Sequence, residues 1–232
     1  MKVRAASSSW VQRLAQSVGA GVARAVLFPL AKVRIAHVRV CPLPGRGLII
    51  ASNHRSMLDF VVGLVAFRRW GVTPVTMVRG DYFQNPFYGA VLRRLGAIPA
   101  GRGYGASAMD RAREVLQSGG VLAMAPEGRI PDHGERVNGV AALKPGVARL
   151  AAEFRSQILL VGISNTDTVW RKGCRTPRLF GGGGPRPIIS LSVELLQLPE
   201  VALEHDITAA VSSGLARLIA TPLVDSREST RT

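Results

Sequence analysis

Short apolar runs alternate with helical stretches along most of the chain. The runs GLIIAS, VTPVTMV, VLAMA and ILLVGI have the length of buried strands, and IISLSV predicts a late strand. Helical spacing of apolar residues is found over residues 57–69, 81–95, 107–117, 145–154 and 207–219. This alternation is typical of an α/β fold in which a mostly parallel sheet is flanked by helices.

The first 40 residues carry a different pattern. If residues 10–28 form a helix, apolar side chains gather on one side, and polar or basic ones such as Arg13 and Arg24 on the other. Arg13, Arg24 and Lys32 interrupt the stretch too often for the ~20 apolar residues that a transmembrane helix needs. We therefore expect an N-terminal amphipathic helix that lies on an anionic membrane surface, while a helix packed on the protein's own core remains the alternative.

Length and composition favour one domain behind this segment. A chain of 232 residues, 47% of them hydrophobic and 19% charged, can bury one sizeable core. We assign residues 1–40 to a basic amphipathic membrane-surface segment and residues 41–232 to the main domain. The two cysteines lie far apart and no cleavable leader is evident, so we expect a reducing, cytosolic environment.

The net charge of +15 is unevenly distributed, because no acidic residue precedes Asp59. A basic N-terminal end predicts an anionic partner, such as a membrane surface, a nucleic acid or an acidic carrier. Nucleic acid is disfavoured, because Trp10 is the one aromatic residue among the early basic residues before Phe28 and offers no stacking platform. A general bias toward arginine remains the alternative explanation for the total charge.

The segment NHRSMLD, residues 53–59, follows an apolar run and places His54 five residues ahead of Asp59. Active sites of parallel sheets gather where strands end and helices begin, so the two residues are candidates for an acid–base pair. Ser56 and Asp59 also form the S-x-x-D pattern of a capping box, which would occupy the carboxylate with the amides of its own helix. The two interpretations can coexist.

Three further stretches extend this pattern. NPFYGAVLRRLGAIPAGR ends in Arg102, APEGR presents Glu127, Gly128 and Arg129 after a strand, and ALKPGVARLA follows a loop. Together with NHRSMLD they resemble, in order and approximate spacing, the four blocks of the lysophosphatidic acid acyltransferase (1-acylglycerol-3-phosphate O-acyltransferase) family. The resemblance covers roughly residues 46–163 and implies a glycerolphosphate acyltransferase-like fold.

The resemblance also implies a reaction. A fatty acyl group would pass from an acyl thioester, acyl-CoA or acyl carrier protein, to the free hydroxyl of a lysophospholipid. The favoured acceptor is 1-acylglycerol-3-phosphate, which would give phosphatidic acid. His54 would be the general base, and Asp59 would hold and stabilise its imidazole. We expect no cofactor beyond the acyl-donor substrate, no metal, and a peripheral location on the cytoplasmic side of the cell membrane.

On the acceptor side, the resemblance implies that Arg102 binds the phosphate through its planar guanidinium and that Glu127, Gly128 and Arg129 line the same site. The chain departs from the family pattern here, because it has EGRI where the family has EGTR, so Arg129 is displaced by one position. These departures leave another lysolipid, such as a lyso-amino-lipid, open as the acceptor.

Two hypotheses other than an acyltransferase remain, a dinucleotide-binding protein and a non-catalytic module. GRGYGA, residues 101–106, fits the G-x-G-x-x-A turn of dinucleotide-binding proteins, although its preceding strand AIPA is short and contains Pro99. A non-catalytic membrane-binding module is the second. Metal catalysis is disfavoured, because His37, His133 and His205 lack ligand spacing.

Overall fold

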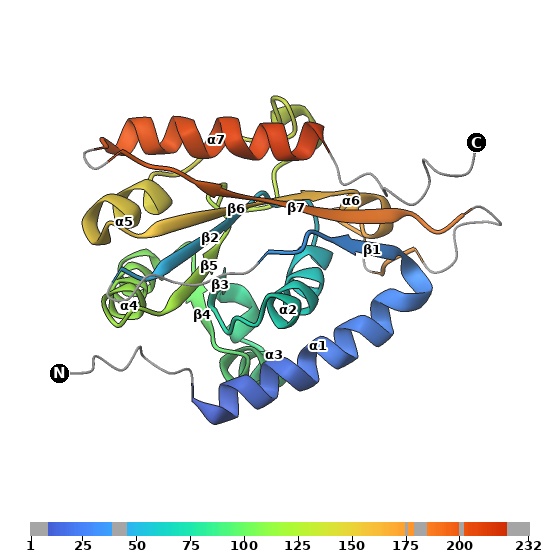
Figure 1. Ribbon diagram of the computed structural model, residues 1–232. Coiled ribbons are helices and arrows are strands. Elements are labelled where there is room, and N and C mark those ends of the chain that lie inside the picture. The colour runs from blue at the N-terminus through green and yellow to red at the C-terminus, as the bar shows by residue number, and fades with distance from the viewer. Residues whose placement is uncertain (1–8, 39–45, 175, 179–184, 200–201, 222–232) are drawn as a thin grey trace.

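The computed structural model describes residues 9–38, 46–174, 176–178, 185–199 and 202–221. The first eight residues of the predicted membrane-surface segment, its boundary at residues 40 and 41, and Cys41 lie outside these ranges. Within them the chain forms one sheet with helices on both faces (Figure 1).

The sheet has seven strands in the order β1-β7-β6-β2-β5-β3-β4. Neighbouring strands are parallel except β6 and β7, which are antiparallel. The predicted mostly parallel α/β fold is therefore confirmed. The strands are β1 (Lys32–Ile35), β2 (Leu48–Ser52), β3 (Val75–Arg79), β4 (Ala97–Ala100), β5 (Val121–Met124), β6 (Gln157–Ser164) and β7 (Ile188–Leu196).

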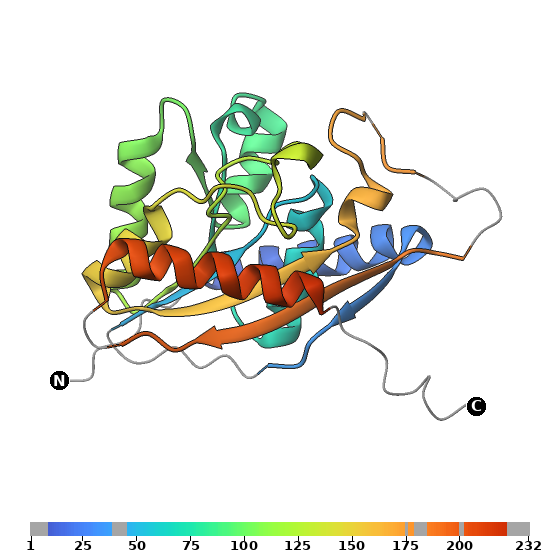
Figure 2. The same ribbon diagram turned by 90° about the horizontal axis from the view of Figure 1, so that it is seen from above.

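The helices divide between the two faces because successive strand residues point to opposite sides. On β2, Leu48 and Ile50 join a core with α1 and α2, whereas Ile49 and Ala51 join a core with α4, α5 and α7. Figure 2, turned to show the sheet from above, shows α7 lying along β6 and β7. The helices are α1 (Trp10–Leu30), α2 (Leu58–Trp70), α3 (Pro86–Arg94), α4 (Gly105–Gln117), α5 (Gly146–Phe154), α6 (Thr166–Val169) and α7 (Glu204–Ala220).

Two of the predicted elements are shortened or divided in the structure, and in each a proline gives the reason. The strand predicted from VTPVTMV begins at Val75, directly after Pro74, which has no N–H to donate to a neighbouring strand. The helix predicted over residues 81–95 is divided into η1, a 3₁₀ helix at Gly80–Phe83, and α3. Pro86 is the first residue of α3, and Asn85 caps that helix by accepting from two of its backbone N–H groups.

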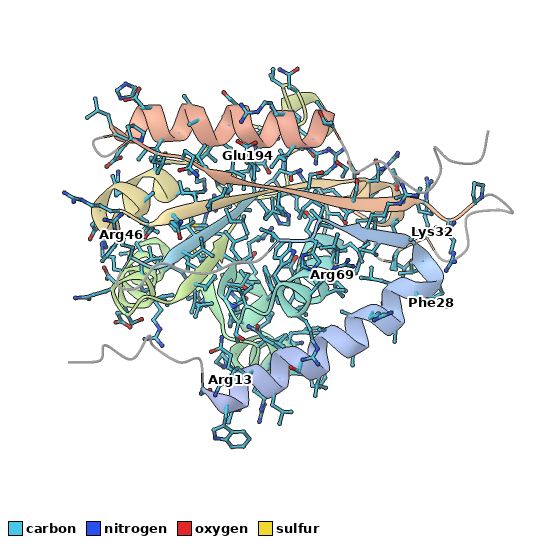
Figure 3. All side chains as sticks on the ribbon, in the orientation of Figure 1. Arg13, Phe28, Lys32, Arg46, Arg69 and Glu194 are labelled. Carbon is cyan, nitrogen blue, oxygen red and sulfur yellow. The ribbon has the colours of Figure 1, made fainter. Side chains whose placement is uncertain are left out.

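Helix α1 packs on the domain and also leaves apolar side chains exposed. Ala20, Ala23, Leu27 and Leu30 are buried on its inner side, and the Gln16 amide donates to the carbonyls of Pro74 and Leu95. The outer side carries the larger apolar residues Trp10, Val11, Leu14, Val18, Val22, Val26 and Phe28, all of them exposed. Figure 3 labels Arg13 and Phe28, toward the two ends of the helix. Across the described residues, no helix is both long and apolar enough to span a membrane.

Candidate active site

Three loops meet at the carboxyl ends of the adjacent strands β6, β2 and β5. His54 follows β2, Glu127 follows β5, and Thr166 follows β6. Parallel strands end at the same edge of a sheet, and this brings side chains from distant parts of the chain together.

His54 and Asp59 form a direct side-chain pair. His54 Nδ1 lies 2.8 Å from Asp59 Oδ2, with the aspartate buried at 7% exposure and the histidine 28% exposed. A carboxylate beside Nδ1 favours the tautomer that carries its proton on that nitrogen. Nε2 is then left with a lone pair that can accept a proton from a molecule at the site.

Asp59 has a hydrogen-bond donor for each of its oxygens. Oδ2 also accepts from the backbone N–H groups of Arg55 at 2.6 Å and Ser56 at 2.9 Å, while Oδ1 accepts from the Thr166 hydroxyl at 2.5 Å. Ser56 Oγ in turn accepts from the N–H of Leu58, at the start of α2. The Asp59 carboxylate thus contacts His54 and also binds two backbone amides that precede α2, so one side chain makes both kinds of contact.

Glu127 joins the His54 loop to a third loop. Its Oε2 accepts from the His54 backbone N–H at 2.7 Å, and its Oε1 accepts from the Ala141 N–H at 3.0 Å. The side chain is buried, and this burial raises the pKa of Glu127 even though the two N–H groups and the charge of Arg136 act in the opposite direction. The sequence predicted Glu127 for acceptor binding, and the structure brings it against the backbone of His54.

Gly128 has a backbone conformation that excludes most other residues. Its φ is +69°, and a Cβ at this position would lie 2.7 Å from the Nζ of Lys144. The space beside this glycine is occupied by the Lys144 side chain, which the sequence analysis missed. Lys144 belongs to the ALKPGVARLA block, and among the described residues its ammonium has no acidic partner.

The two predicted arginines lie in different surroundings. The Arg129 guanidinium donates two hydrogen bonds to the Glu135 carboxylate, at 2.7 and 2.6 Å. Hydrogen bonding to Arg129 lowers the pKa of Glu135 to about 2. Arg102 lies in the turn after β4, exposed, and forms no ion pair with any residue that the structure describes. The structure brings neither arginine into contact with the His54–Asp59 pair.

An ion cluster that the sequence analysis missed lies beside His54. Arg55 Nε and Nη2 donate to the two oxygens of Asp167 at 3.1 and 3.0 Å, and Arg136 Nη1 donates to the same carboxylate at 3.2 Å. Burial alone would raise the pKa of Asp167, but the hydrogen bond and charge of Arg55, with the charge of Arg136, hold it below its ordinary value. Arg55 and Asp167 are far apart in sequence, so no local pattern could have paired them.

The geometry gives little support for the two other kinds of chemistry considered from the sequence, dinucleotide binding and metal binding. GRGYGA forms the turn after β4 and the first two residues of α4. Strand β4 lies at the edge of the sheet, whereas dinucleotides bind where the strand order of a sheet reverses. In the described parts of the chain, no group of three or more His, Cys, Asp or Glu side chains could hold a metal ion.

Comparisons with known proteins give a family from one source and a fold from another. The model of the acyltransferase family matches residues 32–164. Among curated protein sequences no significant match is found. Among solved structures, the crystal structure of the 1-acyl-sn-glycerophosphate (LPA) acyltransferase PlsC from Thermotoga maritima is similar, with a TM-score of 0.68. It is 18% identical, and the match covers 90% of this chain and 78% of that chain, a likeness that shows the fold.

Proposed function

The chain belongs to the acyltransferase family, and from this premise we propose that it transfers a fatty acyl group from an acyl thioester to the free hydroxyl of a lysophospholipid. The favoured acceptor is 1-acylglycerol-3-phosphate, with phosphatidic acid as the product. The family match and the fold support the reaction class, and the choice of acceptor is part of the proposal.

One observation carries the proposal. The His54 imidazole is bound through Nδ1 to a buried carboxylate and is still partly exposed, beside the end of a central strand. An imidazole held in this way can take a proton through Nε2 while the carboxylate stabilises the resulting imidazolium.

The proposed reaction balances without a further reactant. His54 Nε2 takes the proton of the acceptor hydroxyl as its oxygen attacks the thioester carbonyl. The new C–O bond forms, the C–S bond breaks, and the proton on His54 passes to the departing sulfur, so that ester and free thiol leave. A thioester is already activated, so direct transfer is chemically reasonable, and the chain has no G-x-S-x-G motif to supply a serine nucleophile.

For the acceptor, we assign the phosphate first to Arg102, because its exposed guanidinium has no acidic partner among the described residues. Glu127, Gly128 and Arg129 line the same site in this proposal. Lys144, next to Gly128, adds a second cation. Arg129 would have to release Glu135 before it could bind a phosphate.

The donor in this proposal is acyl-CoA or acyl carrier protein. Both are anionic, and the net charge of +15 favours their approach to the protein. A lyso-amino-lipid is the alternative acceptor, because fewer cations at the site would be needed to bind it.

We also assign the protein to the cytoplasmic face of the cell membrane, bound peripherally through α1. The exposed apolar side of α1 would enter the boundary between headgroups and acyl chains, with Arg13 and Arg24 near anionic headgroups. This arrangement places the enzyme on the surface where both its acceptor and its product reside.

Thiol release from acyl-CoA in the presence of 1-acylglycerol-3-phosphate and anionic vesicles tests the proposal. Wild type should release thiol only when the acceptor is added, and folded His54→Ala should lose about 10²- to 10⁴-fold in rate. His205→Ala is the matched control, because His205 also contacts an aspartate, Asp206, at 3.0 Å but on the exposed surface of α7.

The outcomes separate the alternatives. Release that needs acyl carrier protein, or a lyso-amino-lipid, would identify the other donor or acceptor within the same reaction class. An equal loss in His54→Ala and His205→Ala would contradict the role of His54. Vesicle binding without transfer from either donor to either acceptor would support a non-catalytic membrane module instead.

A further inference from the structure

Thr166 completes the hydrogen bonding of the Asp59 carboxylate. Thr166 is fully buried, and its hydroxyl lies 2.5 Å from Asp59 Oδ1. A carboxylate only accepts hydrogen bonds, so the threonine hydroxyl donates. The three other donors, including His54 Nδ1, all bind Oδ2, and among the described residues Thr166 is the one donor to Oδ1.

Helix α6, of which Thr166 is the first residue, is attached to the His54 loop at two more points. Asp167 binds the Arg55 guanidinium through both oxygens, and the Ser56 hydroxyl donates to the Trp170 carbonyl at 2.7 Å. Each bond joins residues more than 100 positions apart in the chain. The segment is therefore fixed against the loop that carries the His–Asp pair, and it has little freedom to withdraw the Thr166 hydroxyl.

We infer that Thr166 is a positioning residue for the acyl-transfer reaction. By donating to Oδ1 it fixes the rotation of the Asp59 carboxylate about its last bond and keeps Oδ2 directed at His54 Nδ1. It also stabilises the charged carboxylate in a dry site, where an oxygen without a donor would be costly. The inference rests on the proposed function, in which His54 is the general base.

The inference predicts a specific kinetic defect. Thr166→Val keeps the shape of the side chain and removes the hydroxyl, so we expect kcat to fall about 10- to 100-fold, as for a lost hydrogen bond to a charged group. KM for donor and acceptor should change less than about twofold, because the hydroxyl lies behind Asp59 and contacts neither substrate. Thr166→Ser, which restores the donor, should recover most of the lost rate.

Thr168→Val is the matched control. Thr168 lies on the same short helix, and its hydroxyl donates to the Asn165 carbonyl at 2.7 Å, away from Asp59. This substitution should leave kcat unchanged. If Thr166→Val does not fold, Thr166→Ala removes the same hydroxyl without adding volume and serves in its place.

A double variant separates positioning from simple support of the fold. If Thr166 acts through Asp59, adding Thr166→Val to Asp59→Asn should reduce kcat little further, whereas independent effects would multiply. Multiplied losses, a Thr166→Ser variant as slow as Thr166→Val, or an unchanged kcat in Thr166→Val would each overturn the inference. Full activity in His54→Ala and Asp59→Asn would instead overturn the proposed function itself.

Discussion

The surroundings of His54 and the outer side of α1 differ in what their side chains contact. The buried carboxylates around His54 are hydrogen-bonded within the chain, whereas the apolar side chains on the outer side of α1 are exposed. Around His54, the buried carboxylates of Asp59 and Glu127 have hydrogen-bond donors at both oxygens from within the chain. On α1, apolar side chains such as Leu14 and Val22 are exposed, with nothing in the described structure covering them.

The difference shows which region has all its contacts in the isolated protein and which region needs a partner to cover it. Buried polar groups must be paired within the fold, so the loop is held in one geometry before any substrate arrives. A stripe of large exposed apolar residues gains free energy only when something covers it. Four variants test this contrast: two change a carboxylate around His54, one changes three residues of α1, and one changes the ion cluster beside His54.

The largest effect is expected for Asp59→Asn. An asparagine can keep the hydrogen bonds at both positions, since the Thr166 hydroxyl can reverse and accept, but it removes the charge that stabilises the imidazolium. Transferase activity should fall about 10²- to 10⁴-fold, with the free energy of unfolding changed by much less than the activity. Kinetics and urea unfolding measure the two; a variant that mainly unfolds would favour the capping role.

Next in size is replacement of three exposed α1 residues, Leu14, Val18 and Val22, by glutamine. They are 56%, 59% and 60% exposed, so stability should change little. Binding to anionic vesicles, measured by sedimentation, should weaken about 100-fold or more, because burial of each side chain is worth about 1.5–3 kcal/mol. Ala209→Gln, on the exposed side of α7, is the control; equal binding by the triple variant would mean that α1 does not enter the membrane.

Glu127→Gln should reduce stability more than its similar shape suggests. Both carboxylate oxygens accept N–H groups, and the glutamine NH₂ would face one of these donors and leave it unpaired. We expect a loss of about 1–3 kcal/mol in the free energy of unfolding, and slower transfer as the His54 backbone shifts. A Glu127→Gln variant as stable as wild type would show that the hydrogen bonds of Glu127 do not hold the backbone around His54 in one geometry.

The smallest effect is expected for Asp167→Asn, on the order of 1 kcal/mol at neutral pH for a partly exposed ion cluster. Because the native pKa of Asp167 is lowered, its carboxylate stabilises the fold fully above the unfolded pKa of about 3.9, and this contribution is lost as pH falls through the native pKa. Urea unfolding at several pH values should show a constant difference between the two proteins above about pH 5 and a shrinking one below about pH 4. If the difference in free energy of unfolding persists unchanged in acid, the shape of the Asp167 side chain, and not its charge, accounts for it.

Patterns of apolar residues predicted most of the fold, because burial on a sheet or helix face leaves a local periodicity. They missed β1, since KVRI is short and half charged and becomes a strand only by pairing with β7. They also grouped the exposed apolar residues of α1 correctly, but could not show that the opposite side, with Gln16, Leu27 and Leu30, would pack on the domain.

For the site, the blocks around His54 and Glu127 identified residues that the structure brings together. Thr166, Arg55 and Asp167 were missed, because their partners lie more than 100 residues away and their role depends on which strands end side by side. Lys144 was missed although it stands in a recognised block, since its contact with Gly128 follows from a positive φ that no spacing encodes.

The pairing of β1 with β7 has a consequence for the order of folding. Lys32 pairs with Ile188, so an edge of the sheet must wait until most of the chain has left the ribosome. Helix α1 ends at Leu30, just before β1, and is therefore synthesised long before β7. If α1 binds a membrane as proposed, a nascent chain can reach the lipid surface through α1 while its sheet is still incomplete, and the slow, long-range closure of the sheet then takes place at the membrane.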